Sequence, residues 1–501
     1  MYTEWSKGYY VGSAYTGGFY PEHTPVSMAW AALVSGTAPP PHEGAFTYLE
    51  LGCGFGETAL AVAAAHPKAR VVAMDMNPDH VVAVRDKASA LGLDNVEVYD
   101  ESFAEFQHDL RADYVASHGV ISWVTDQVRQ DFTAMLDRTT NAGGLVYISY
   151  NAMPGRAAAR VLQRLIVDRL QHETGTDLQR LEKAMSFAGR VAENSYFFKN
   201  HQTVARYLDQ TKKRPVAYLA HEFINGAWDP LWFEDVARLL EGARLSWVGA
   251  ADSVRSVGSL STPRSLRPML EAIPDRLHRQ TVRDVLLDTG FRRDLFGRGR
   301  RSMPPGGQRR RVLQTRFCLA EPRDQCKLDV VVPAGEIRLH DEPYEAILDA
   351  LAEGPRTGFS MVGPVDEDAE QIFIGMLVLV AVGYAKPCLT VVPDPEREQS
   401  IRDVNLRAAS QIDDEAVRLV SPLTGHGRRL GRFDALILRG VMEGREDIPR
   451  FAAHALHEAG QQLILDDMPV VDPEELVPEF RKLETRFHER IRPLLELDGM
   501  L

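Results

Sequence analysis

Cysteine is scarce in this 501-residue sequence, which contains four. The four are Cys53, Cys318, Cys326 and Cys388. They are too few and too scattered for a disulfide framework, and the spacing of Cys318 and Cys326 does not match the paired motifs of zinc sites. We therefore expect small apolar side chains in a protein from a reducing compartment, and no metal site.

Long hydrophobic runs are also absent. The best candidate, Ile372–Tyr384, is interrupted by glycine and is shorter than the roughly 20 residues that a membrane span requires. The first five residues, Met1–Trp5, show neither the basic start nor the apolar run of a signal peptide. These absences predict a cytoplasmic, soluble protein without membrane insertion.

Positive charge is in deficit, since 57 Lys and Arg face 70 Asp and Glu and the formal net charge is −13. Recognition of a nucleic-acid backbone needs a surplus of basic residues, so we expect no nucleic-acid partner. Arginine is dense only between Phe291 and Arg316. We interpret that stretch as a solvated loop, or alternatively as an electrostatic contact for an acidic partner.

The chain is too long for a single core, and its pattern from Phe46 onward alternates strands with helices. The expected strands are Thr47–Leu51, Arg70–Asp75, Val96–Tyr99, Ala112–His118 and Leu145–Tyr150, the expected helices are Glu57–Ala65, Pro78–Leu91 and Val128–Arg138, and a turn is expected at Asn141–Gly144. This alternation indicates a parallel, doubly wound α/β sheet with right-handed crossovers. Two later strands, Leu245–Val248 and Val312–Ala320, are expected to complete the sheet, with residues 156–231 and 252–311 as inserts.

The remaining segments differ in composition. The expected organisation is an aromatic N-terminal segment over 1–45 with a helix at Val26–Ser35, the sheet core over 46–155, helical inserts with the last two strands over 156–325, a winged-helix-like domain over 326–398 and a helical domain over 399–501. The winged-helix-like domain should contain helices His340–Leu351 and Asp368–Val380 and a strand at Leu389–Val392. Because its second helix is nearly all apolar, an interaction role is favoured over DNA binding. The last domain should end in the helix Glu474–Arg490.

A glycine-rich loop, E-L-G-C-G-F-G at 50–56, follows the first expected strand. Its glycines permit a tight turn and a close approach to a ligand at a helix N-terminus. Asp75 ends the next strand, where a carboxylate accepts hydrogen bonds from ribose hydroxyls. The third glycine, Gly56, comes one residue too early for the nicotinamide fingerprint. Glu50, which leads the loop, favours a cationic cofactor with an amino-acid end, as in S-adenosyl-L-methionine.

This loop, the strand V-V-A-M-D-M-N-P at 71–78 and H-G-V-I-S-W-V at 118–124 resemble the class I S-adenosylmethionine-dependent methyltransferases over residues 46–155. The segments F-Y-P-E at 19–22, Y-I-S-Y-N-A-M-P-G at 147–155 and Y-L-A-H-E-F at 218–223 resemble the members with a methyltransferase regulatory domain. That group includes rickettsial protein-lysine methyltransferases, which modify outer-membrane proteins and end in a winged-helix domain. The resemblance implies a seven-stranded Rossmann-like sheet.

The cofactor contacts expected from the loop, the strand ends and the resemblance can be given by residue. They are Glu50, Gly52, Cys53, Gly54, Gly56, Asp75, Met76, Ser102, Phe103, His118 and Gly119. The sequence departs from the resemblance at one place, because many members have an Asp-Phe pair against the adenine where this chain has Ser102-Phe103. Phe103 can stack on the adenine, but the acceptor for the adenine amino group is left open.

Aromatic and polar residues near the ends of the fourth and fifth strands are candidates for catalysis. Methyl transfer is an in-line displacement that requires alignment and a dry pocket, and aromatic faces can hold a sulfonium or an alkylammonium. His118, Asn151 and Tyr20 are the candidate catalytic residues. The candidate substrate contacts are Tyr15, Phe19, Trp123, His221, Glu222 and Asn225. For Tyr15 and Phe19 the alternative is packing of an N-terminal arm, and for His221 and Glu222 it is a structural role.

These observations favour an S-adenosylmethionine-dependent N-methyltransferase that acts on lysine side chains of a protein partner, with a homodimer as one possible assembly. A small-molecule N- or O-methyltransferase of a biosynthetic pathway is the first alternative. A regulatory protein whose methyltransferase domain only senses the cofactor is the second.

Overall fold

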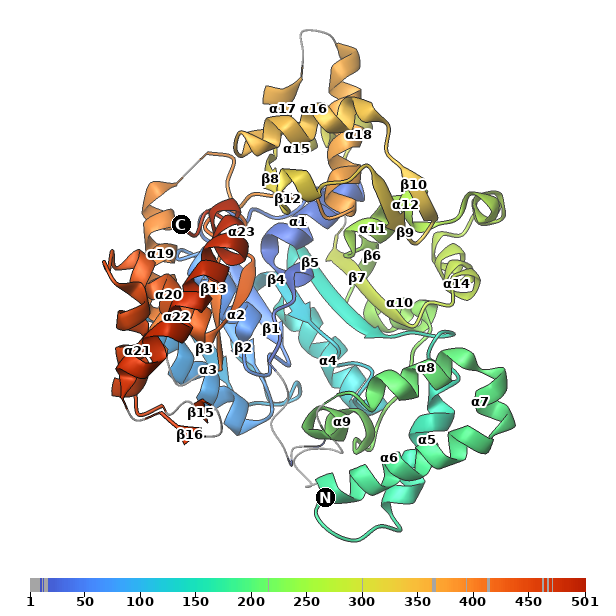
Figure 1. The fold of residues 1–501 in the computed structure, drawn as a ribbon. Helices are drawn as coiled ribbons and strands as arrows, with labels where there is room; N and C mark the ends of the chain where they lie inside the picture. The colour runs from blue at the N-terminus through green and yellow to red at the C-terminus, as the bar shows by residue number, and fades with distance from the viewer. Residues whose placement is uncertain are drawn as a thin grey trace.

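A seven-stranded sheet lies at the centre of the computed structural model (Figure 1). The structure describes residues 10, 12, 17–214, 216–299, 301–362, 366–392, 394–411, 415–461, 464–465, 468–470 and 472–501. The strand order is β3-β2-β1-β4-β5-β7-β6. The strands are β1 (Thr47–Leu51), β2 (Arg70–Met74), β3 (Val96–Tyr99), β4 (Ala112–Ser117), β5 (Thr140–Asn151), β6 (Leu245–Ala250) and β7 (Phe291–Arg298). Strands β1 to β5 are parallel, and β7 runs antiparallel to both of its neighbours.

Helices cover both faces of this sheet, as a doubly wound fold requires. One face carries α1 (Pro25–Val34), α2 (Glu57–Ala65) and α3 (Pro78–Leu91), and the other carries α4 (Asp126–Thr139) and α10 (Phe233–Glu241). Successive strand residues point to opposite faces. Tyr48 therefore packs into the core under α1 to α3, whereas Leu49 packs into the core under α4 and α10. The expected α/β class and the bounds of the first strands and helices are confirmed.

Two inserts leave the sheet after β5 and after β6. The first contains α5 (Ala159–Leu170), α6 (Asp177–Asn194), α7 (Tyr196–Asn200), α8 (Gln202–Thr211) and α9 (Val216–Phe223), which share a hydrophobic core of their own and appear in green in Figure 1. The second contains α11 (Ser253–Ser256), α12 (Gly258–Ser261), α13 (Arg267–Glu271) and α14 (Arg276–Leu286). The first insert places α9 beside the carboxyl ends of the strands.

The arginine-dense stretch is not the loop that we expected. Its first part forms β7, and Arg292 in this strand is 2% exposed and bonds the carboxylates of Asp284 and Asp294 at 2.6 Å each. The expected last strand, Val312–Ala320, is wrong as well, because α15 (Pro305–Gln314) occupies its start and β8 (Arg316–Leu319) joins another sheet. Paired carboxylates neutralise the buried arginine, so the strand is internal in spite of its charge.

A smaller misprediction concerns the turn at Asn141–Gly144. Strand β5 already begins at Thr140, and its register against β4 shifts between Ala112 and Tyr114. Gly143 takes a φ of 84° there. The strand accommodates the glycines as an irregularity at its start, where the ladder is interrupted.

The next unit is a three-stranded sheet in the order β11-β8-β12, with helices on it. Its elements are β9 (Asp329–Val332) and β10 (Gly335–Arg338), which form a separate hairpin, α16 (Asp341–Ala352), β11 (Arg356–Thr357), α17 (Gly358–Met361), α18 (Asp366–Ala381) and β12 (Ala385–Pro387). The two expected helices are confirmed. The strand expected at Leu389–Val392 lies earlier, because Ala385–Pro387 pairs with Phe317–Leu319 of β8.

The last unit packs against α2 and α3 (Figure 1, orange to red). It contains α19 (Pro395–Ala409), β13 (Ala416–Val420), β14 (Gly427–Gly431), α20 (Arg432–Met442), α21 (Ile448–Glu458), β15 (Ile464–Leu465), β16 (Met468–Pro469), α22 (Val477–Arg486), a π-helical turn at Phe487–Ile491 and α23 (Arg492–Leu497). The helical character agrees with expectation, but the β13–β14 hairpin was not predicted. All four cysteines are buried and form no disulfide. In the described ranges no helix combines the length and apolar character of a membrane span.

Candidate functional site

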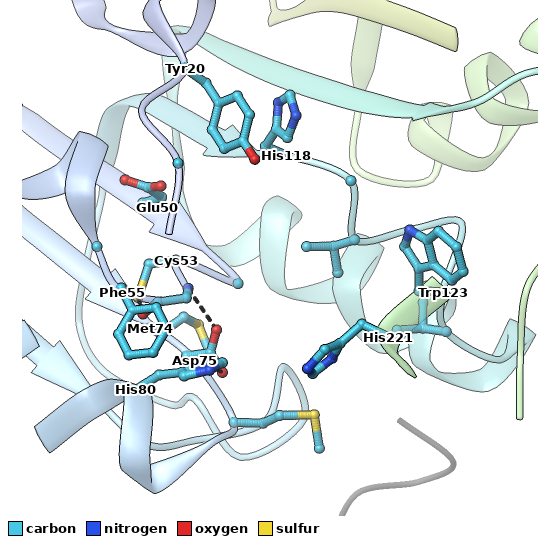
Figure 2. A pocket seen from close by; sticks show the side chains of 18 of the residues that line it. Tyr20, Glu50, Cys53, Phe55, Met74, Asp75, His80, His118, Trp123 and His221 are labelled. Atoms are coloured by element: carbon cyan, nitrogen blue, oxygen red, sulfur yellow. Dashed lines mark hydrogen bonds and ion pairs between the residues drawn. The ribbon is translucent and has the colours of Figure 1, made fainter. Parts of the chain in front are cut away.

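A cavity of about 400 Å³ opens at the carboxyl ends of β1, β2 and β4, beneath the N-terminal segment and α9 (Figure 2). It brings together almost all of the residues that the sequence singled out. These are Tyr20, Glu50, Gly52, Cys53, Gly54, Gly56, Asp75, Met76, Ser102, Phe103, His118, Gly119, Trp123, Asn151, His221, Glu222 and Asn225. Tyr15 lies outside the described residues, and Phe19 lies outside the cavity.

The glycine loop forms one wall because its backbone enters the left-handed region. Gly52, Gly54 and Gly56 have φ values of 72°, 55° and 63°. A Cβ atom on Gly52 would lie 2.6 Å from Cγ2 of Val120, and one on Gly56 would lie 2.8 Å from Cγ2 of Val84. Neither position tolerates a side chain without movement of its neighbours. The loop can therefore present bare backbone to a ligand.

Asp75 holds the loop against the end of β2. One of its carboxylate oxygens accepts from the backbone N–H of Gly54 at 2.8 Å. The other accepts from the backbone N–H of Asn77 at 2.9 Å and lies 3.2 Å from Nδ1 of His80. The carboxylate is thus fixed at the cavity wall, where it has lone pairs left for ligand hydroxyls.

Glu50 is a buried carboxyl group at the start of the loop, 6% exposed. Burial raises its pKa to about 8, while the hydroxyl of Tyr48, 3.4 Å away, and the backbone N–H of Ala59 oppose that rise. None of the described lysines or arginines is close enough to stabilise its charge. A ligand with a positive charge would supply the missing partner.

His118 is held between two aromatic side chains. The ring of Tyr20 stacks on it with centroids 3.7 Å apart and an angle of 16°, and Figure 2 shows the two rings face to face. Its Nδ1 shares a hydrogen bond of 2.9 Å with the hydroxyl of Tyr147. Burial, together with the charge of Arg293, lowers the pKa of His118 to about 3. The imidazole is therefore neutral throughout the physiological range.

Helix α9 and the N-terminal segment form the opposite wall of the cavity. The side-chain amide of Asn225 accepts from the backbone N–H of Tyr10 at 2.7 Å and donates to the carbonyl of His221 at 2.7 Å. The ring of Tyr10 packs edge-on against His221, 5.3 Å between centroids. Glu222 is bonded to the hydroxyl of Tyr207 at 3.4 Å. Trp123 and His221 face the cavity from this side (Figure 2).

Several lining residues were missed by sequence reasoning. The charged and aromatic ones among them are Phe55, Glu57, His80, Glu101, Asp131, Arg156, Phe291 and Arg293. Arg293 lies in β7 opposite Ser149 of β5 and pairs with Glu22 at 3.3 Å, and no signal was available for it because β7 was read as a loop. Glu101 was detectable as the acid directly before Ser102.

Glu101 has an unused acceptor. Its Oε1 lies 2.8 Å from Nε2 of His108, but its Oε2 is buried and has no hydrogen-bond partner among the described residues. The neighbouring Ser102 hydroxyl donates instead to Glu105 at 2.6 Å. A buried acceptor close to Phe103 in sequence is therefore left unused among the described residues.

Acidic residues dominate the cavity wall. Among the described residues that line it, acidic residues outnumber arginines six to two, and no lysine is present. The acidic residues are Glu50, which keeps its proton at neutral pH until a cation binds beside it, and Glu57, Asp75, Glu101, Asp131 and Glu222. Such a lining attracts cationic ligands and disfavours anionic ones.

Phe19 packs as part of the N-terminal segment, which was the alternative to a substrate contact. Its ring packs under the guanidinium of Arg418, 5.4 Å from the ring centroid, and near the ring of His426, 6.3 Å between centroids. It contacts the C-terminal unit instead of the cavity. The adjacent Tyr20 points into the cavity.

Comparison with known proteins gives matches along the whole chain. The description "Methyltransferase domain" matches residues 49–144, and "Predicted methyltransferase regulatory domain" matches residues 215–298. The uncharacterized protein sll1526 of Synechocystis sp. is 32% identical over 509 residues, which cover 99% of both chains. The structure of PKMT2 from Rickettsia typhi in complex with AdoHcy has a TM-score of 0.69 at 17% identity, covering 95% of this chain and 98% of that one. A second structure of PKMT2 has a TM-score of 0.67 at 18% identity, covering 95% and 99%.

Proposed function

This chain belongs to the S-adenosylmethionine-dependent methyltransferases with a methyltransferase regulatory domain, and we propose that it methylates lysine side chains of a protein. The fold that it shares over 95% of its length with PKMT2, a rickettsial protein-lysine methyltransferase, supports this acceptor. The observation that carries the proposal is the acidic cavity, because both the sulfonium cofactor and a lysine ammonium are cations.

The residues of the cavity fit the cofactor from end to end. Glu50, buried without a cation, is the partner for the α-amino group of the methionine part. Asp75 is placed for the ribose hydroxyls, as in dinucleotide-binding folds. Glu101 offers its free Oε2 to the adenine amino group while Phe103 stacks on the ring. When bound, S-adenosylmethionine would supply an electrophilic methyl group that a neutral amine attacks in line, with S-adenosylhomocysteine as the leaving group.

The lining residues that are not assigned to the cofactor form the proposed binding site for the lysine side chain. Trp123 and Tyr20 offer aromatic faces to an alkylammonium, and Glu222 offers a carboxylate. The side-chain carbonyl of Asn151, at the end of β5, is placed to accept a hydrogen bond from the amine. These contacts orient the lysine side chain toward the cofactor.

His118 is not expected to act as the general base that removes the proton of the lysine amine. With a pKa of about 3, its imidazole is too weak a base to retain the proton of an amine whose pKa is about 10.4. We assign it a positioning role through its stack with Tyr20. Transfer requires the neutral amine, so the lysine releases its proton to solvent before the site closes around it; burial of the amine favours that release, and the nearby carboxylate of Glu222 opposes it.

The test is transfer of label from methyl-labelled S-adenosylmethionine into a lysate of the source organism, with the Asp75→Ala protein as control. We expect label in nuclease-resistant, acid-precipitable material and methyl-lysine after hydrolysis of that material. Label in the small-molecule fraction would instead support a biosynthetic enzyme. Cofactor binding without turnover on any acceptor would support a sensor.

A further inference from the structure

Arg418 of β13 reaches from the C-terminal unit to the cofactor loop. Its Nε donates to a carboxylate oxygen of Glu57 at 2.6 Å, and its Nη2 contacts the same oxygen. Its guanidinium also covers the ring of Phe19 at 5.4 Å. The side chains of Arg418 and Glu57 are only 19% and 21% exposed, so water screens the pair weakly.

Glu57 is the point at which this contact meets the cofactor cavity. It is the first residue of α2, directly after Gly56, and it lines the cavity. A Cβ atom on Gly17 would lie 2.5 Å from its Oε1, so the N-terminal segment passes directly over the carboxylate. The backbone N–H of Tyr20 donates to Oγ1 of Thr58, the next residue of α2, at 3.1 Å. Residues 17–20 therefore rest on the first turn of α2.

The rest of the β13–β14 hairpin supports the same segment from behind. His426, in the turn, lies within hydrogen-bond distance of Oγ of Ser27, 3.1 Å from its Nε2. A Cβ atom on Gly427 would lie 3.0 Å from Cδ2 of Phe19. A second cavity of about 100 Å³, between α2 and β13, is lined by Arg418 and Glu57 themselves. Packing beside the ion pair is thus incomplete, and the guanidinium bridges the gap.

We infer that Arg418 is a positioning residue for the cofactor. By binding Glu57 and Phe19 together, it holds residues 17–20 over the cavity, with Tyr20 stacked on His118. The C-terminal unit is then a structural part of the cofactor site, although none of its described residues lines the cavity. This inference concerns cofactor binding alone and does not depend on the identity of the acceptor.

The primary experiment is titration calorimetry of the full-length Arg418→Gln protein with S-adenosylhomocysteine. S-adenosylhomocysteine has no sulfonium charge. Its affinity therefore depends more on the position of the cavity wall than on the net charge of that wall. We expect the Kd to rise about tenfold, which corresponds to about 1.4 kcal/mol. The matched control is Arg429→Gln, because Arg429 is the cross-strand neighbour of Arg418 and lines the same small cavity. Its Kd should stay within about twofold of the wild-type value.

A double-mutant cycle tests the route through Glu57. In the Glu57→Gln background, Arg418→Gln should change the Kd by less than about twofold, because the ion pair is already broken. Arg418→Lys, which keeps the charge, should restore part of the affinity. In rate measurements KM for S-adenosylmethionine should rise while kcat at saturating cofactor stays within about twofold.

Three results would overturn the inference. The first is a wild-type Kd in Arg418→Gln, and the second is an equal rise in Arg429→Gln. The third is an undiminished effect of Arg418→Gln in the Glu57→Gln background. If Arg418→Gln has a lowered melting temperature, Phe19→Leu tests the same contact from its other side, and a wild-type Kd in that variant would overturn the inference as well.

Discussion

Replacement of Glu50 by glutamine should stabilise the free protein and weaken its cofactor binding. The carboxyl is 6% exposed, and burial raises its pKa from the ordinary 4.5 to about 8. Between these two pH values the folded chain keeps a proton that the unfolded chain has released. The free energy of unfolding therefore falls as pH rises from about 4.5 to about 8 and is constant above that range.

The size of the effect follows from the shift. One pKa unit corresponds to about 1.36 kcal/mol, so the loss is about 3 kcal/mol at pH 7 and about 5 kcal/mol at pH 9. Glutamine has no proton to lose in this range, and its amide oxygen can still accept from the N–H of Ala59. Glu50→Gln should therefore match the wild type at pH 4.5 and exceed its stability by these amounts at higher pH.

Urea unfolding at pH 5, 7 and 9 without cofactor measures the difference in the free energy of unfolding between the wild type and Glu50→Gln. Calorimetry at pH 7 measures the second half of the prediction, because a cationic amino group beside Glu50 favours the ionised carboxylate. Wild-type protein should release close to one proton when it binds S-adenosylhomocysteine, and Glu50→Gln should release none and bind more weakly. Parallel stability curves for the two proteins, or equal proton release, would refute the reasoning.

Three further predictions concern other parts of the molecule. Gly52→Ala should raise the Kd for the cofactor at least about tenfold by calorimetry, because φ is 72° there and the new methyl would lie 2.6 Å from Val120. Arg292→Leu should lower the free energy of urea unfolding by about 3–5 kcal/mol, because it leaves Asp294 charged and buried without its guanidinium partner, whereas Asp284 keeps Arg255. Trp123→Leu should raise KM for the acceptor about fivefold and leave KM for the cofactor unchanged in initial-rate assays.

Matched variants separate these effects from general damage. Gly44 has a φ of 81° with open space around it, so Gly44→Ala reports backbone strain without the clash. Arg309 is exposed and paired with Glu370 at 2.9 Å, and Arg309→Leu should cost less than about 1 kcal/mol. Trp228→Leu removes the ring beside Trp123 and should leave the acceptor KM near the wild-type value. If a control variant changed the measured Kd, free energy of unfolding or KM as much as its test variant did, the corresponding prediction would be wrong.

The cofactor half of the site was accessible from the sequence because it is local. Glycine spacing in Glu50–Gly56 and the acid at Asp75 belong to two consecutive strand ends, and parallel strands bring such ends together. Six of the seven strands, including Leu245–Val248 in β6, also follow from hydrophobic pattern and turn residues alone. Local rules suffice where neighbours in sequence are neighbours in space.

The seventh strand could not be predicted in this way. Arg292 is internal only because Asp284 and Asp294 neutralise it, and the ring of Phe233 lies 4.1 Å from its guanidinium carbon. A pattern method counts an arginine as exposed and cannot see partners that the fold assembles. The same limit hid Arg293 from the list of site residues.

In the N-terminal segment, the sequence does not show which aromatic side chains face the cavity. Phe19 and Tyr20 are adjacent, and the backbone at Tyr20 is extended, with φ of −122° and ψ of 99°. Neighbouring side chains on extended backbone point in opposite directions. Tyr20 thus faces the cavity and Phe19 faces Arg418, but the sequence alone does not say which of the two faces inward.

The residues that line the cavity come from separate blocks of the sequence. Most contacts expected for the cofactor are encoded between residues 50 and 103, whereas most of the proposed acceptor wall is encoded at 118–156 and 221–225, with Tyr20 upstream of both. An exchange confined to residues 110–230 would replace most of the proposed acceptor wall and keep both the cofactor loop and Arg418. Laboratory chimaeras that exchange this block would therefore test whether acceptor choice can be altered without loss of cofactor binding.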